Sequence, residues 1–152
     1  HYGLQQVVRQ GTAASAYQRL PATMTLAGKT GTTNDMRDSW FAGSAGQLLS
    51  VVWLGRDDNQ PIGLSGGSGA LPVWTDLMVR LQPSAPAPTM PANVTWEWLD
   101  ADSGRLSAET CSDAIRVPVS AKGRPQDMTA CASGGVPAFL DNVVKGVMSI
   151  FH

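Results

Sequence analysis

The sequence predicts an α/β protein of the α+β kind, in which helices cover an antiparallel sheet. Three strand candidates follow one another within residues 25–55, and the glycine-rich residues 43–46 between the last two suggest a hairpin turn. Segments with helical periodicity stand before and after these strands. Strands joined by such short connections form an antiparallel meander, because parallel neighbours need a long crossover.

The elements are expected in the following order. A helix over residues 3–9 stops at Gly11, and strands follow at about 25–32, 38–43 and 47–55. The third strand is almost continuously apolar, which predicts burial on both faces. Ser68 is expected to cap a core helix. The apolar residues that recur along this helix are Leu71, Trp74, Leu77, Met78 and Leu81.

Residues 83–91 contain four prolines and predict an extended, semi-rigid linker. The linker separates a domain at residues 1–82 from an extension at 92–152, in which Trp96, Trp98 and Leu99 predict a short strand. A final amphipathic helix is expected from about 137 to 151. It contains one cationic residue, which favours packing on its own domain over binding to anionic lipid.

The two cysteines, Cys111 and Cys131, lie in a segment rich in Gly, Pro, Ser and Asp that has little hydrophobic periodicity. A covalent link would help such a segment to become ordered, by about 3 kcal/mol for a loop of this length. The alternative is two unrelated buried thiols. We expect a disulfide and therefore an oxidising compartment.

Charge and hydropathy exclude several classes of protein. The chain has 11 Lys and Arg against 12 Asp and Glu, which argues against a nucleic-acid-binding face. The longest run of large apolar residues, at 51–54, is far too short to span a bilayer. No targeting segment is visible, and the sequence reads as part of a longer polypeptide.

The segment Gly28-Lys29-Thr30-Gly31-Thr32 suggests a binding strand. A phosphate loop would have its lysine after the glycines and a helix next, and this order is absent. A tight turn with a solvated lysine remains an alternative. Acyl transfer by a serine enzyme uses every residue of the segment: a cation and two hydroxyls for a substrate carboxylate, a glycine for close approach, and a backbone N–H for the oxyanion.

The sequence resembles the penicillin-binding proteins and serine β-lactamases, whose motifs are Ser-x-x-Lys, Ser-x-Asn and Lys-Thr-Gly. Five ordered segments are similar to landmarks of the bifunctional, class A penicillin-binding proteins. They are Gly11 to Ala14, Gly28 to Asn34, Asp38 to Gly43, Trp53 to Asp58 and Gly66 to Trp74. The cysteine-bearing extension is most similar to that of the 1b-type enzymes of Gram-negative bacteria.

The resemblance implies a role for each residue of the segment. Lys29 would complete the active site, Thr30 and Thr32 would bind a terminal carboxylate, and Gly31 would admit a peptidoglycan stem peptide ending in D-Ala-D-Ala, or a β-lactam that mimics it. The Thr32 N–H would be one arm of an oxyanion hole. The reaction would be D,D-transpeptidation through an acyl-enzyme, with no metal and no cofactor. We expect Trp40 and Phe41 to pack in the core.

The chain departs from the family pattern because it contains no Ser-x-x-Lys and no Ser-x-Asn. The resemblance therefore implies that the nucleophile, a glycosyltransferase domain and a membrane anchor lie before His1, on a protein at the periplasmic side of the bacterial inner membrane. An outer-membrane lipoprotein would be its activator. The chain alone should neither react with penicillin nor unfold cooperatively. The alternatives are a serine β-lactamase, a penicillin sensor, or a non-catalytic periplasmic interaction module at residues 92–152.

Overall fold

A computed structural model describes residues 1–83 and 89–131, and the chain divides into two compact units, residues 1–88 and 89–152. The division falls inside the proline-rich segment 83–91. The observed fold combines antiparallel sheets with helices, as predicted, so the α+β class is confirmed. The elements of the first unit are α1 (Tyr2–Gln10), η1 (Thr12–Gln18), β1 (Leu26–Thr32), η2 (Asn34–Met36), β2 (Ser39–Ala45), β3 (Leu48–Leu54) and α2 (Ala70–Leu81).

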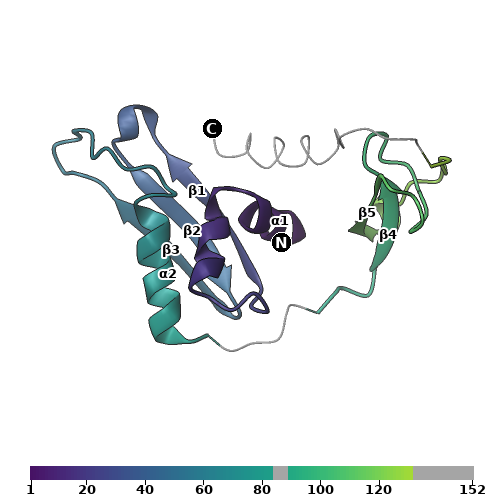
Figure 1. The fold of residues 1–152 in the computed structure, drawn as a ribbon, viewed down its shortest axis with the longest axis horizontal. Helices are drawn as coiled ribbons and strands as arrows, with labels where there is room; N and C mark the ends of the chain where they lie inside the picture. Colours follow the sequence, from purple (N-terminus) through teal and green to yellow (C-terminus); the bar gives the residue numbers. More distant parts are fainter. Residues whose placement is uncertain (84–88, 132–152) are drawn as a thin grey trace. The chain divides into compact units, whose positions relative to one another are not determined.

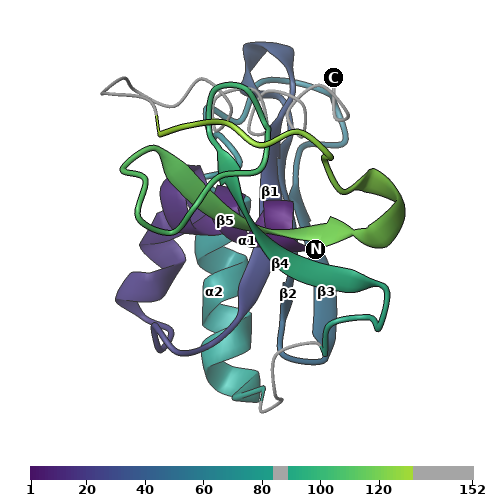
Figure 2. The ribbon, with the colours of Figure 1, turned by 90° about the vertical axis from the view of Figure 1, so that its right-hand side faces the viewer.

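The first unit is built on a sheet of three strands in the order β1-β2-β3, with both pairs antiparallel (Figure 2). β1 and β3 are therefore the edge strands. β2 continues through Ala45, which pairs with Leu48, so the hairpin turn is Gly46-Gln47 and not residues 43–46. Gly46 adopts a φ of 58°, a conformation that glycine reaches without steric cost and that tight hairpin turns require.

The helix α2 packs on β2 and β3 and covers one face of the sheet (Figure 1). Phe41 of β2 and Trp74 of α2 are both 1% exposed, and their rings meet edge to face with centroids 4.9 Å apart. Aromatic pairs of this kind add stability beyond the area they bury. The buried members of this core are Val8, Ala13, Ala16, Leu20, Leu26, Phe41, Ala45, Ala70, Leu71, Trp74 and Met78.

The predicted cap of α2 is wrong. The N-cap residue is Gly69, and the Ser68 hydroxyl bonds to Ser65 instead. The first helical N–H, that of Ala70, donates to the hydroxyl of the buried Ser39 at 2.9 Å, so a strand residue supplies what a local cap would otherwise provide. The predicted apolar stripe is also only partly buried, because Leu77 and Leu81 are exposed.

The prediction that the third strand is buried on both faces is wrong in this chain. Leu49, Val51 and Trp53 of β3 are 76%, 58% and 46% exposed. Trp40, predicted to be in the core, faces the same way and is 42% exposed, whereas Phe41 is buried as predicted. The physical reason is that α2 covers one face of β2 and β3, while side chains alternate between the two faces of a strand.

The second unit contains a two-stranded antiparallel sheet of β4 (Val94–Asp100) and β5 (Ala114–Ser120), followed by η3 (Ala121–Gly123). β4 was predicted, and β5 was not. Leu106 bridges to both Leu99 and Met128, which ties two further stretches of chain to the hairpin. The predicted disulfide joins Cys111 and Cys131 across 20 positions of sequence, so this prediction is confirmed.

The buried Asp100 organises the turn that follows β4. One of its carboxylate oxygens accepts hydrogen bonds from the N–H and the hydroxyl of Ser103, which lower the pKa of Asp100 below its usual value. The helix predicted at about 137–151 lies outside the described residues. Within residues 1–83 and 89–131, no helix is long and apolar enough to cross a membrane.

Candidate functional site

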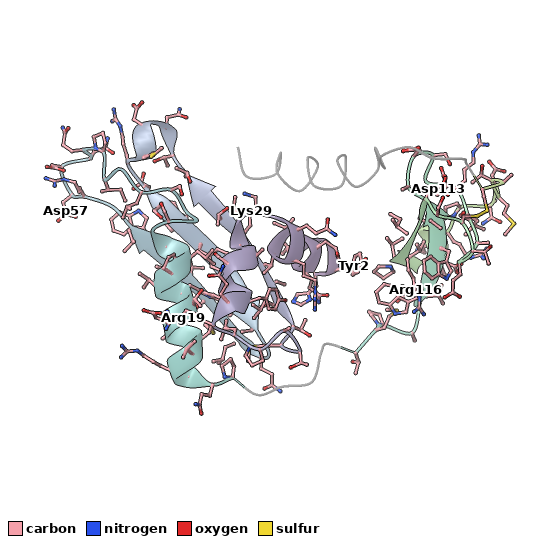
Figure 3. The ribbon with its side chains drawn as sticks, viewed as in Figure 1. Tyr2, Arg19, Lys29, Asp57, Asp113 and Arg116 are labelled. Carbon is pink, nitrogen blue, oxygen red and sulfur yellow. A yellow bond between two sulfur atoms is a disulfide. The ribbon has the colours of Figure 1, made fainter. Side chains whose placement is uncertain are left out.

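The Lys-Thr-Gly-Thr segment forms the second half of β1, an edge strand of the first unit's sheet. Figure 3 shows the side chain of Lys29 on this strand. Burial decreases steadily along β1, from the buried Leu26, Ala27 and Gly28 to the exposed Thr32. The segment thus emerges from the core toward solvent, as a binding strand must.

The segment's side chains are divided between the two faces of β1. In the register with β2, Thr30 and Thr32 stand opposite Phe41 and Ser39, which are buried on the face that α2 covers. Lys29 and Gly31 stand opposite Ala42 and Trp40 on the other face. The structure therefore brings the two threonine hydroxyls together on one face and places the lysine on the opposite one.

The backbone of Thr30 and Thr32 points to the edge of β1 that pairs with no other strand in the described part of the chain. The register continues to Thr33 and Asp38, whose N–H to C=O bond of 3.2 Å marks a hydrogen-bonded pair. Hydrogen-bonded and non-hydrogen-bonded pairs alternate in an antiparallel ladder, so the residues at positions 30 and 32 direct their N–H and C=O groups away from β2. The N–H of Thr32 is thus directed outward, as an oxyanion-hole donor would be.

The ammonium group of Lys29 lies at this same edge. Its Nζ donates to the carbonyl oxygen of Thr30 at 2.6 Å. Partial burial of the side chain lowers the pKa of Lys29 below the usual lysine value, because desolvation disfavours the charged form. A lysine of lowered pKa can take part in proton transfer nearer to neutral pH.

Two groups from outside the sheet contact the threonine hydroxyls. The hydroxyl oxygens of Thr12 and Thr30 are 2.9 Å apart, and the N–H of Gly66 donates to the hydroxyl oxygen of Thr32 at 2.8 Å. Thr12 begins η1, and Gly66 belongs to the loop that leads into α2. Segments distant in sequence thus meet at the end of β1.

Asp38 fixes the connection from β1 to β2. Its carboxylate accepts hydrogen bonds from the Trp53 indole at 2.9 Å and from the Thr33 hydroxyl at 3.1 Å, and its own N–H donates to that hydroxyl at 2.8 Å. The N–H of Ile62 donates to the carbonyl of Met36 in the same connection. Asp38 thus ties the residues that follow the threonines to Trp53 at the end of β3.

A shallow hollow of about 380 Å³ is lined by Gly55, Arg56, Asp57 and Asp58, none of which belongs to β1. The guanidinium of Arg56 makes two hydrogen bonds to the Asp58 carboxylate, so the charge of each group is satisfied by the other. Among the described residues, no three His, Cys, Asp or Glu side chains form a group that could hold a metal ion.

The chain is similar in sequence to curated penicillin-binding proteins, although no model of a known protein family matches it. It is 48% identical to penicillin-binding protein 1B of Haemophilus influenzae over 95 residues, which cover 62% of the chain and 12% of that protein. It is 40% identical to penicillin-binding protein 1B of Vibrio cholerae over 119 residues, 78% of the chain and 15% of that protein.

The Escherichia coli penicillin-binding protein 1B is 36% identical over 114 residues, which cover 75% of the chain and 13% of that protein. The chain belongs to the penicillin-binding protein family, in which its relatives are of types 1A and 1B. It spans about an eighth of the length of these relatives. The crystal structure of penicillin-binding protein 1A from H. influenzae has the same fold, with a TM-score of 0.69 and 25% identity over 85% of this chain and 19% of that one.

Sequence reasoning on this penicillin-binding protein segment did not assign roles to Thr12, Asp38 or Gly66. The signal was present, since all three lie in the landmark segments quoted above. Their contacts with Thr30, Thr32 and Trp53 join residues separated by between 15 and 34 positions. Such contacts become visible only when the segments are folded together.

Proposed function

We propose that this chain supplies the substrate-binding strand of a peptidoglycan D,D-transpeptidase, within a bifunctional glycosyltransferase and transpeptidase. The reaction proceeds through a serine acyl-enzyme and consumes stem peptides that end in D-Ala-D-Ala. β-Lactams acylate the same serine. The single observation that carries this proposal is the free edge of β1, where two threonine hydroxyls, an ammonium group and outward-facing backbone groups gather.

Edge-strand pairing supports the binding role. An extended peptide can add to the free edge of β1 through the outward N–H and C=O groups of Thr30 and Thr32. A Cβ on Gly31 would lie 3.2 Å from the Trp40 Cβ, on the face opposite the two hydroxyls, so glycine at this position leaves that side of the edge unobstructed for the peptide. The hydroxyls of Thr30 and Thr32 then donate to the terminal carboxylate, and the Thr32 N–H stabilises the oxyanion that forms at the scissile carbonyl.

Lys29 has the electrostatic role in this proposal. Its ammonium group lies at the same edge and attracts the substrate carboxylate. Because its pKa is lowered by burial, it also assists proton transfer around the nucleophile. The sequence holds no Ser-x-x-Lys and no Ser-x-Asn, so the nucleophile and its base come from a part of the polypeptide outside this segment.

The disulfide supports a location on the periplasmic side of the bacterial inner membrane. Disulfides persist in oxidising compartments and are rare in the reducing cytosol. Cys111 and Cys131 are bonded in the second unit, so a periplasmic position fits the covalent chemistry of this chain. We also propose that this unit, which is compact by itself, is the non-catalytic part to which a lipoprotein activator binds.

The test is acylation of the complete polypeptide containing this segment by a fluorescent penicillin. Lys29→Met and the double variant Thr30→Val with Thr32→Val should each lower the acylation rate by at least about tenfold, since hydrogen bonds to charged groups are worth about 1.5–3 kcal/mol each. Lys122→Met in the second unit is the matched control and should leave the rate unchanged. Unchanged rates in both active-site variants would refute the proposal.

The same preparation separates a transpeptidase from a β-lactamase. The acyl-enzyme of a transpeptidase persists, so the fluorescent label should stay on the protein after excess reagent is removed. Rapid loss of the label with release of hydrolysed penicillin would instead establish a β-lactamase.

A further inference from the structure

The hydroxyls of Thr30 and Thr32 are each held by a partner that is not part of the sheet. Thr12 contacts the first, with 2.9 Å between the two hydroxyl oxygens, and the N–H of Gly66 contacts the second at 2.8 Å. We call Thr12 and Gly66 the hydroxyl frame. Neither residue has a role in the function proposed above.

Gly66 rests directly on the backbone of the two paired strands. A Cβ built on Gly66 would lie 2.6 Å from the carbonyl oxygens of Gly31 and Trp40 and 2.9 Å from the Gly31 nitrogen. These distances are shorter than real Cβ contacts, and backbone atoms within a ladder cannot move aside cheaply. Glycine at position 66 is therefore what lets the loop reach Thr32.

Ser39 of β2 anchors the loop before α2 through two hydrogen bonds. The Ser39 hydroxyl donates to the carbonyl of Ser65 at 2.7 Å and accepts from the N–H of Ala70 at 2.9 Å. Gly67 is the next residue of the loop. A Cβ built on it would lie 3.8 Å from the Thr12 Cβ, which is an ordinary contact distance. The loop before α2 and the start of η1 thus meet at the threonine face of β1.

The polarity of these contacts matches an acceptor-only ligand. A threonine hydroxyl has one proton to donate and accepts through its lone pairs, and an ionised carboxylate only accepts. Because the Gly66 N–H already donates to Thr32, the Thr32 hydroxyl is free to direct its proton outward. Thr30 reaches the same state when Thr12 donates to it, which the contact between the two hydroxyls permits.

We propose that Thr12 and Gly66 are positioning residues that orient the Thr30 and Thr32 hydroxyls to donate to a carboxylate. The inference rests on the proposed function, since it needs these two hydroxyls to bind the carboxylate of the stem peptide or β-lactam. The frame contacts the two hydroxyls, whereas the Lys29 ammonium bonds to the backbone carbonyl of Thr30, so the effect proposed here is on the direction of the hydroxyl hydrogen bonds.

The experiment compares two ligands in the complete polypeptide: benzylpenicillin and its methyl ester, which lacks the free carboxylate. The measured quantity is the ratio of their acylation rates, determined by competition with a fluorescent penicillin. Thr12→Val should lower this ratio by about three- to tenfold, the effect of one lost hydrogen bond. Thr12→Ser keeps the hydroxyl and should restore the ratio.

Gly66→Ala should also lower the ratio, because the added Cβ displaces the loop and breaks the bond to Thr32. Gly67→Ala is the matched control, since its Cβ would meet nothing closer than 3.8 Å. Both variants are checked by thermal unfolding, so that a loss of ratio can be separated from a loss of fold.

The outcomes are distinct. The frame is refuted if Thr12→Val keeps the full ratio, or if Thr12→Ser lowers it as much as Thr12→Val does, which would indicate a purely structural contact. If the unaltered polypeptide reacts equally with acid and ester, carboxylate binding by this strand is refuted, and the inference falls with it. If acid and ester differ but the ratio is insensitive to Thr12 and Gly66, the proposed function stands and the frame does not.

Discussion

The two faces of the β1-β2-β3 sheet differ sharply in this chain. The face under α2 is closed by Phe41, Trp74 and their neighbours, and Ser39 on it is completely buried with both hydrogen-bonding roles used. The other face carries Lys29 and exposed Trp40. The face under α2 thus supplies rigidity and also holds the two threonine hydroxyls at the end of β1, whereas the other face presents Lys29 and apolar surface.

The largest difference between the faces should appear when an aromatic residue is removed from each. Phe41→Ala should lower the free energy of opening of β2 by about 3–5 kcal/mol, because it leaves a cavity against Trp74. Trp40→Ala, one position along the strand, should cost only about 1 kcal/mol, mainly its contact with Trp53. Amide hydrogen exchange of β2 measures both free energies. Equal losses in the two variants would show that the two faces of the sheet do not differ in their contribution to stability.

Removal of a hydroxyl from the sheet face under α2 should have the next largest effect on stability. Ser39→Ala leaves the N–H of Ala70 and the carbonyl of Ser65 without their partner, and we expect a loss of about 1–3 kcal/mol in the opening free energy of the loop before α2. Ser50→Ala is the matched control, because the buried Ser50 hydroxyl has no hydrogen-bond partner among residues 1–83 and 89–131, and its removal should be neutral or stabilising.

A charge introduced on the sheet face that α2 does not cover should have little effect on the stability of this chain. Val51→Lys should change the opening free energy of β3 by less than about 1 kcal/mol, since position 51 is 58% exposed. In the complete polypeptide the same substitution should cost several kcal/mol if other segments cover this face, because a buried charge without a partner is expensive. Hydrogen exchange on both forms would show whether this apolar surface is an internal contact.

The smallest effect concerns Lys29 and pH. Its pKa is lowered in the folded chain by desolvation, so the unfolded chain binds more protons between that lowered value and the usual lysine pKa. Stability should therefore rise slightly as the pH increases through this window, and Lys29→Met should remove that part of the slope. An NMR titration of the lysine side chains should show Lys29 titrating below the usual value, and a normal value would exclude the partial burial described here.

The sequence by itself determined the strand order in the meander, the disulfide and the family. Apolar strand candidates, glycine positions, the composition around the two cysteines and five ordered landmarks were sufficient, because these are local patterns that neighbouring residues express. The cap of α2 and the exposure of β3 could not be predicted this way. Ser39, whose hydroxyl accepts the hydrogen bond from Ala70, lies 31 positions before it in sequence. The exposure of Val51 depends on which face of the sheet α2 covers.

The same division holds at the site. The sequence indicated Lys29, Thr30, Gly31 and Thr32 as a group, but the separation of the lysine from the two hydroxyls follows from the register with β2. The contacts of Thr12 and Gly66 exist only because η1 and the loop before α2 both pack at the end of β1. Hydrogen bonds between distant segments are selected by packing of the core, and packing is a property of the whole fold.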